Sequence, residues 1–500
     1  MERLRADAVV VGSGAGGAPA ACALAEAGLD VVVLEAGPRL ETSDFTGEPQ
    51  DMLARLMTAA NAAGSGMELY AGRCVGGSTV VNDALCWRPP PEILDAWARA
   101  LGAELSQAAF APYVERVWET IGAAPTDRAH LNRNAWQLER GAARLGWRAG
   151  PMARNVRGCA NLGLCNLGCP TGAKQSALLT WIPRAERAGA RVLPGVRVER
   201  VRVEAGGAVG VDAVRVDPIG AAPETPLAVD APLVVLAAGV LATPAILLRS
   251  GVAAGGGVQL HSSVHVTARF PEPVHGYYGP TMAYAVSQFS DVNGHGGPGF
   301  MLENVTVDAV TTAGALPGFG DAHARRMAAL PYLARALVVL RDRARGTTVL
   351  GRDGAARIEY EPFVDDLWRL REGMAAIARA YLAAGALEVW LPLHDAPPIL
   401  RESDLAGLAD WEVSPRSLTL LYAVHLFGGA VMAPDAQSGP CDPSGAVRGV
   451  RGLYVSDASG LPGNTGVNPQ VTVQANALRV ADAALAARPA GALARGSRAS

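Results

Sequence analysis

Three glycines near the N-terminus have the spacing of a phosphate-binding turn. Gly12, Gly14 and Gly17 form the pattern G-x-G-x-x-G directly after the uncharged apolar run 8–11. In such a turn, the first glycine allows a tight bend and the second lets the backbone approach a pyrophosphate, while the third lets the next helix pack close to the strand. The pattern predicts that a helix over residues 18–27 points its first amides at phosphate.

An acidic residue follows this turn where it can accept hydrogen bonds from ribose hydroxyls. Residues 31–34 are typical of a second buried strand, and Glu35 ends it, 18 residues after Gly17. A carboxylate at this position disfavours the 2′-phosphate of NADP. The order of strand, glycines, helix, strand and acid therefore predicts a dinucleotide site, without distinguishing FAD from NAD.

Three cysteines lie on one glycine-rich loop and have spacing that suggests a metal site. Cys159, Cys165 and Cys169 occur in RGCANLGLCNLGCPTG, and the Cys-Pro ending is typical of ferredoxin cluster loops. Zinc is the weakest interpretation because no histidine or fourth cysteine lies nearby. A disulfide is disfavoured in a cytosolic protein. An iron–sulfur cluster and plain structural thiols therefore stay open as alternatives.

The elements around these residues indicate a large α/β protein. Five hundred residues, half of them hydrophobic, are enough for two or three domains. Short apolar runs at 8–11, 31–34, 233–237 and 453–456 are typical of buried parallel strands. From about 256 to 424 the residue composition changes, and His, Tyr, Met and Pro become frequent. This change indicates a second domain.

Composition also limits the partners. The formal net charge is −3 and no basic stripe is present, which argues against nucleic acid or an anionic membrane as the main partner. The longest apolar run, 233–248, is too short to span a bilayer and contains Pro244. We therefore expect no integral membrane segment and, without a signal peptide before the first strand, a cytoplasmic location.

Several longer motifs resemble the glucose–methanol–choline (GMC) oxidoreductase family. They are VVVGSGAGG with Glu35, GRCVGGSTVVND, LAAGVLATPAILLRSG, HLFGGAVMA and GLYVSDASGLPGNTGVNPQVTV. The resemblance covers most of the chain and looks closest to the cholesterol-oxidase branch. The cysteine loop is similar to loops in long-chain alcohol oxidases and to the 3Fe-4S loop of FAD-dependent glucose dehydrogenases. Residues 260–400 match no motif, so the resemblance does not identify the substrate.

The resemblance implies a discontinuous, Rossmann-like FAD-binding domain and an α+β substrate-binding domain with an antiparallel sheet. The FAD-binding domain is expected over 1–85, 155–255 and 430–487. The substrate-binding domain and a helical cap are expected over 86–154 and 256–429, and a disordered tail over 488–500.

The same resemblance assigns the contacts to FAD. The ADP part is expected at Gly12, Ser13, Gly14, Gly17 and Glu35, with the backbone of Val198 at the adenine. The remaining contacts are Gly77, Ser78 and Asn82 at the pyrophosphate and flavin, Asp457 and Ala458 at the ribityl-pyrophosphate region, and Asn468 and Pro469 at the pyrimidine. No residue matches the family's covalent-flavin histidine, so we expect FAD to be non-covalent.

The family's catalytic pair maps onto His425 and Asn468. Alcohol oxidation needs a hydride acceptor, which flavin N5 supplies, and a base for the hydroxyl proton. Histidine suits this role because its pKa lies near neutral. Asparagine has no useful pKa, so Asn468 is expected to orient the hydroxyl by hydrogen bonding while His425 acts as the general base.

Four other side chains are weaker candidates. His261, His265 and His275 could line a pocket, but strand-edge or surface positions are the favoured interpretation. Glu303 is a candidate for a second acid or base, as one carboxylate is in cholesterol oxidases, although single acids on strands are usually solvated.

The leading hypothesis is an FAD-dependent dehydrogenase or oxidase acting on the CH-OH group of a sugar, sterol, long-chain or biosynthetic alcohol. A 3Fe-4S cluster would imply a protein electron acceptor in place of oxygen. The main alternative is a GMC-fold lyase or other non-redox enzyme that keeps FAD for structural reasons. An NAD-dependent enzyme is disfavoured by the C-terminal motif, and an inactive binding protein is disfavoured by the presence of both His425 and Asn468.

Overall fold

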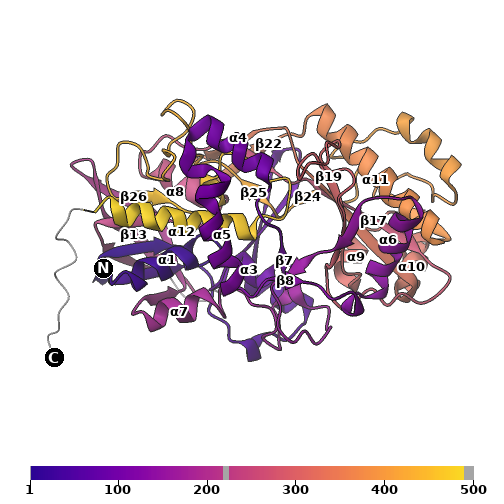
Figure 1. Ribbon diagram of the computed structural model, residues 1–500, viewed down its shortest axis with the longest axis horizontal. Helices are drawn as coiled ribbons and strands as arrows, with labels where there is room; N and C mark the ends of the chain where they lie inside the picture. Colours follow the sequence, from indigo (N-terminus) through magenta and orange to yellow (C-terminus); the bar gives the residue numbers. More distant parts are fainter. Residues whose placement is uncertain (1, 218–223, 489–500) are drawn as a thin grey trace.

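The computed structural model describes residues 2–217 and 224–488, and two lobes lie side by side in it (Figure 1). One lobe is built on a parallel sheet and the other on a large mixed sheet. The α/β class and the antiparallel strands of the second lobe confirm the predicted fold. The tail predicted from residue 488 lies, after Arg488, outside the described residues.

The parallel sheet joins segments that are far apart in the sequence. Its strand order is β11-β3-β2-β15-β26, and all neighbours are parallel. The strands are β2 (Ala8–Val11), β3 (Val31–Glu35), β11 (Arg191–Pro194), β15 (Leu233–Leu236) and β26 (Leu453–Val455). Fully buried runs such as AVVV in β2 form four of these strands because helices cover both faces of a parallel sheet, whereas the edge strand β11 (RVLP) is partly exposed. The C-terminal segment thus completes the sheet that the N-terminal segment begins.

A nine-stranded sheet forms the centre of the second lobe, and most of its pairs are antiparallel. The strands are β4 (Met57–Asn61), β6 (Glu68–Gly72), β9 (Ala149–Pro151), β17 (Ser263–Arg269), β18 (Tyr284–Val286), β19 (Phe300–Asn304), β20 (Leu333–Leu340), β23 (Glu388–Trp390) and β24 (Tyr422–Ala423). His265 in β17 and Glu303 in β19 both pair with Leu337 of β20, so they lie on the same face of the sheet.

Three further sheets complete the fold. Their strands are β1 (Glu2–Arg5), β12 (Val196–Glu204), β13 (Gly207–Arg215) and β14 (Thr225–Asp230); β7 (Leu85–Cys86), β8 (Ala124–Pro125) and β10 (Ala153–Arg154); and β5 (Ala63–Gly64), β16 (Gly256–Leu260), β21 (Gly346–Leu350), β22 (Ala356–Tyr360) and β25 (Leu426–Phe427). Strand β16 pairs with β25 and leads into β17, so it joins the HLFGG motif to the nine-stranded sheet.

Helices cover both central sheets. They are α1 (Gly17–Glu26), α2 (Pro49–Leu56), α3 (Ser78–Val81), α4 (Pro91–Leu101), α5 (Gln107–Thr120), α6 (Arg133–Arg144), α7 (Trp181–Arg187), α8 (Thr243–Arg249), α9 (Ala309–Ala315), α10 (Gly320–Ala328), α11 (Val364–Ala384) and α12 (Gln470–Ala486). Helices α1 and α12 pack together beside the parallel sheet, while α11 packs on β17 and β20 (Figure 1). Within the described residues, no helix is long and apolar enough to cross a membrane.

Candidate functional site

The turn between β2 and α1, which we call the nucleotide turn (Gly12–Gly17), requires glycine for steric reasons. Gly12 has a φ of +97°, and a Cβ atom there or at Gly17 would overlap backbone carbonyl oxygens, that of Ala237 for Gly12 and that of Gly12 for Gly17. No side chain caps the first amides of the ten-residue helix α1. These amides therefore suit a phosphate group.

A second glycine loop, before α3, lies against the nucleotide turn. A Cβ atom on Gly77, where φ is +52°, would approach the Cα atom of Gly14 to 2.7 Å. The cradle between the two loops is thus lined by backbone, as a pyrophosphate site requires. The Ser78 hydroxyl accepts a hydrogen bond from the Gly72 amide at 2.9 Å, which ties this loop to β6.

Glu35 is buried and holds the nucleotide turn in place through Ser13. One of its carboxylate oxygens accepts hydrogen bonds from the amide (3.1 Å) and hydroxyl (2.7 Å) of Ser13, and the other accepts from the Gly37 amide at 2.9 Å. The Ser13 hydroxyl in turn accepts from the Gly76 amide at 3.1 Å. Burial raises the pKa of Glu35, and these donors counteract that shift.

The C-terminal motif meets the nucleotide turn at Asp457. A Cβ atom on Gly16 would approach the Cα atom of Asp457 to 2.6 Å. The Asp457 carboxylate accepts hydrogen bonds from the Gly239 amide (2.7 Å) and the Thr243 hydroxyl (2.6 Å), and its other oxygen accepts from the Ser459 amide at 2.8 Å. Because protein donors fill this carboxylate, any contact of Asp457 with FAD falls to its backbone.

The other residues expected at the cofactor occupy supporting positions. A register shift in the β12–β13 ladder follows Val198, which interrupts the pairing where an adenine contact is expected. The Ala458 carbonyl accepts from the Gly428 amide at 3.1 Å. Pro469 directly precedes α12.

Two residues that the sequence analysis did not single out hold the segment around Asn82. Gln470 accepts a hydrogen bond from the Asn82 side chain at 3.0 Å. Lys174, the one lysine in the chain, is buried and donates to the carbonyls of Val80 (2.5 Å), Asn82 (2.8 Å) and Cys165 (2.5 Å). Sequence spacing could not predict this role, because the three carbonyls come from segments that meet only in the folded protein.

His425 is paired with a second histidine, His261. Their Nδ1 atoms are 3.2 Å apart, and the His261 amide donates to the His425 carbonyl at 3.1 Å. The Gly466 amide donates to Nε2 of His261 at 3.2 Å. Burial lowers the pKa of His425 to about 4 and that of His261 well below its usual value. His261 is therefore neither a surface nor a strand-edge histidine, in contrast to the favoured interpretation.

Asn468 is connected to Glu303. Its side-chain amide donates to one Glu303 carboxylate oxygen at 3.4 Å. The other carboxylate oxygen and the Asn468 carbonyl oxygen are buried and have no hydrogen-bond partner among the described residues. Burial raises the pKa of Glu303 to about 8, so the expectation that this acid is solvated is wrong. We call His261, His425, Asn468 and Glu303 the His–Asn region.

The remaining histidines lie apart from this pairing. His265 is buried, and its Nε2 lies 2.7 Å from the hydroxyl of Tyr422. His275 instead lies 2.7 Å from the Tyr277 hydroxyl in an exposed turn. His261 and His265 are buried, so of the three only His275 fits the strand-edge or surface position that was favoured for all of them.

The cysteine loop does not form a metal-binding group. Cys159, Cys165 and Cys169 line one small cavity of about 20 Å³, and all three thiols are free. Arg154 donates to the Cys165 sulfur at 3.2 Å. Nowhere in residues 2–217 and 224–488 are three or more His, Cys, Asp or Glu side chains arranged to hold a metal ion. Nothing in these residues therefore supports the predicted 3Fe-4S cluster.

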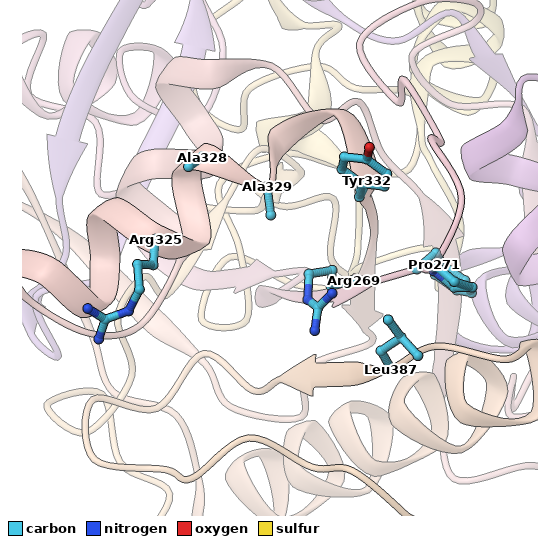
Figure 2. A pocket seen from close by; sticks show the side chains of 8 residues that line it. Arg269, Pro271, Arg325, Ala328, Ala329, Tyr332 and Leu387 are labelled. Carbon is cyan, nitrogen blue, oxygen red and sulfur yellow. The ribbon is translucent and has the colours of Figure 1, made fainter.

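A larger hollow, of about 480 Å³, lies at the surface of the second lobe. Figure 2 shows its lining, which is Arg269, Phe270, Pro271, Arg325, Ala328, Ala329, Tyr332 and Leu387. Arg269 forms an ion pair with Glu388. None of the residues predicted for the site lines this hollow, so it is separate from the candidate site.

Comparisons with known proteins agree with this geometry. A sequence model described as GMC oxidoreductase matches residues 6–265, and a second with the same description matches residues 347–477. An uncharacterized GMC-type oxidoreductase of Mycobacterium tuberculosis is 37% identical over 492 residues, which cover 96% of this chain and 76% of the relative.

Two further similarities concern proteins with named activities. A long-chain-alcohol oxidase of Arabidopsis thaliana is 30% identical over 512 residues, which cover 95% of this chain and 66% of the relative. The crystal structure of a pyridoxine 4-oxidase from Mesorbium loti has a TM-score of 0.69 at 19% identity, covering 95% of this chain and 98% of that one. The second likeness bears on the fold alone.

Proposed function

Because the chain belongs to the GMC oxidoreductase family and is a flavoenzyme acting on alcohol-type donors, we propose that His425 and Asn468 hold the hydroxyl group that it oxidises. FAD, when bound, supplies the hydride acceptor at its N5 atom. The glycine loops at Gly14 and Gly77 fit its pyrophosphate because neither position carries a side chain and a Cβ atom at Gly77 would crowd Gly14. The observation that carries the proposal is the buried carbonyl oxygen of Asn468, which has no partner among the described residues. Asn468 lies two residues after Gly466, whose amide bonds to His261, the partner of the neutral His425.

In this proposal, His425 takes the proton of the hydroxyl group. A histidine whose pKa lies near 4 is neutral at physiological pH and therefore has a lone pair to offer. Asn468 orients the hydroxyl by hydrogen bonding. The alcohol loses one proton to His425 and one hydride to the cofactor, and it leaves as an aldehyde or ketone.

The surroundings of Glu303 favour an alcohol with a large apolar part. Ala285 and Leu337, which pair with Glu303 across the sheet, belong to an apolar cluster with Met152, Met282 and Val339. With a pKa of about 8, Glu303 is mostly uncharged at neutral pH, so it adds no fixed anion to this face. The likeness to a long-chain-alcohol oxidase supports the same substrate class.

The test is anaerobic mixing of the purified holoenzyme with long-chain primary alcohols, sterols and sugars while flavin absorbance is followed. We expect long-chain alcohols to bleach the flavin and to yield the matching aldehyde. If no alcohol bleaches it while the protein cleaves a cyanohydrin, the enzyme is a lyase and the proposal is wrong. Oxygen is then added to the reduced enzyme, because the argument for a protein acceptor depended on the unsupported cluster.

A further inference from the structure

The hydrogen bonds around His261 determine where its proton lies. A backbone amide can only donate, so the Gly466 amide, 3.2 Å from Nε2 of His261, requires a lone pair on that nitrogen. A neutral imidazole carries one proton, and burial keeps His261 neutral. The nearby Arg341 guanidinium acts in the same direction. The proton of His261 therefore lies on Nδ1.

The same reasoning extends to His425. The two Nδ1 atoms are 3.2 Å apart, and a hydrogen bond between them needs one donor and one acceptor. Because His261 supplies the proton, Nδ1 of His425 is the acceptor. The proton of neutral His425 is then on Nε2, and Nδ1 is the one ring atom of His425 with a hydrogen-bond partner among the described residues.

We propose that His261 is a positioning residue that fixes the tautomer of His425, with the Gly466 amide as the anchor, so that resting His425 presents an N–H donor at Nε2. This direction is the reverse of a catalytic triad, where the partner accepts the Nδ1 proton of the base and leaves its Nε2 lone pair free. The catalytic consequence rests on the proposed function, whereas the tautomer itself does not.

Base action at Nε2 then requires the histidine pair to rearrange. In the base-competent arrangement, the protons lie on Nδ1 of His425 and on Nε2 of His261, so the pair still carries two protons. His261 would then direct an N–H group at the Gly466 N–H, and one hydrogen bond is lost. A lost buried hydrogen bond disfavours this arrangement about 10- to 100-fold. Gly466 lies two residues before Asn468. Movement of this segment would therefore break the Gly466–His261 hydrogen bond and shift Asn468 at the same time.

The first test needs no substrate. Holoenzyme labelled with ¹⁵N-histidine has eight histidines, and ¹H–¹⁵N multiple-bond spectra distinguish protonated from unprotonated ring nitrogens. His425→Gln and His261→Asn identify the two rings by the loss of their signals. We expect the proton on Nε2 of His425 and on Nδ1 of His261. A proton on Nδ1 of His425 would overturn the proposal.

Two variants of His261 test the direction of the bond. In His261→Asn, the side-chain amide can still donate to His425, so the His425 tautomer stays as in the wild type. In His261→Asp, a carboxylate can only accept, so the His425 proton moves to Nδ1. His265→Asn is the matched control, since His265 is equally buried but bonds to Tyr422, and it should leave the His425 tautomer unchanged.

The pH dependence of anaerobic flavin reduction provides a functional readout. In His261→Asp, the carboxylate stabilises protonated His425, so the fall of the reduction rate at low pH should begin at a higher pH. In His261→Asn, this fall should stay where it is in the wild type. The role of His261 would be refuted if the pH–rate profile is unchanged in both variants and the His425 tautomer is unchanged in His261→Asp. If no alcohol reduces the flavin, the proposed function fails while the tautomer assignment stands on the spectra.

Discussion

At the nucleotide turn, both carboxylate oxygens of Glu35 and of Asp457 accept hydrogen bonds from protein donors, whereas in the His–Asn region two buried oxygens have no partner among the described residues. A filled carboxylate fixes the position of the backbone around it. An unpartnered buried oxygen carries a desolvation cost unless a bound molecule satisfies it. The first region therefore supplies a rigid backbone cradle, and the second keeps hydrogen-bonding capacity for a substrate.

The first prediction concerns the cradle, where the whole cofactor is at stake. In Gly17→Ala, the new methyl group overlaps the Gly12 carbonyl, which costs about 3 kcal/mol or more and weakens FAD binding about 100-fold. The flavin-to-protein absorbance ratio after desalting measures this loss. Gly314→Ala is the control, because no atom lies within 4 Å of its Cβ position. Flavin retained in Gly17→Ala would contradict the assignment of the turn to FAD.

The second prediction separates chemistry from binding. His425→Gln should keep FAD but slow flavin reduction by an alcohol about 10²- to 10⁴-fold, which is the usual contribution of a general base. Stopped-flow absorbance under anaerobic conditions measures the rate. His323→Gln, on helix α10, should react at the wild-type rate. If His425→Gln loses its flavin instead, the two regions are not independent and the comparison is wrong.

The third prediction concerns the pKa of Glu303, which burial raises from 4.5 to about 8. Between these values, the folded protein binds a proton that the unfolded chain releases, so wild-type unfolding free energy falls as pH rises. Glu303→Gln cannot ionise and lacks this fall. At about pH 8 the variant should be more stable than the wild type by about 1 kcal/mol or more.

Denaturant titrations at about pH 5.5 and about pH 8 measure this difference. Glu359→Gln, an exposed glutamate on strand β22, is the control and should show no such pH-dependent gain. Parallel pH curves for the wild type and Glu303→Gln would mean that Glu303 is solvated and ionised after all.

The smallest effect is expected at the cysteine loop. Because the thiols form no metal-binding group, Cys159→Ser should change stability by less than about 0.5 kcal/mol and leave the flavin spectrum unchanged. Iron and acid-labile sulfide are measured on the same wild-type sample. About three irons per flavin in the wild type, lost in the variant, would restore the cluster interpretation.

The features predicted from sequence are mostly those that local patterns determine. The glycine spacing predicts the nucleotide turn between β2 and α1. Uncharged runs such as 8–11 and 453–455 form parallel strands, as predicted. The family resemblance is confirmed, and the pairing of His425 with Asn468 remains a prediction.

The features that sequence missed depend on contacts between distant segments. Nothing near His261 indicates that it meets His425, because β16 and β25 bring them together. Glu303 was expected to be solvated. Its burial follows from its place in the nine-stranded sheet, where its neighbours Ala285 and Leu337 belong to an apolar cluster. The cysteine spacing suggested a cluster, but the side chains take other partners, such as Arg154 for Cys165.

The contact between Gly16 and Asp457 has a consequence for how the protein is made. A ribosome that has released the first four strands of the parallel sheet has not yet released β26 or the loop that packs on the turn. Domains usually fold as units during synthesis, but this one spans almost the whole chain. The nucleotide site is therefore complete only after the C-terminal segment has been made, and until then β15 has an unpaired edge.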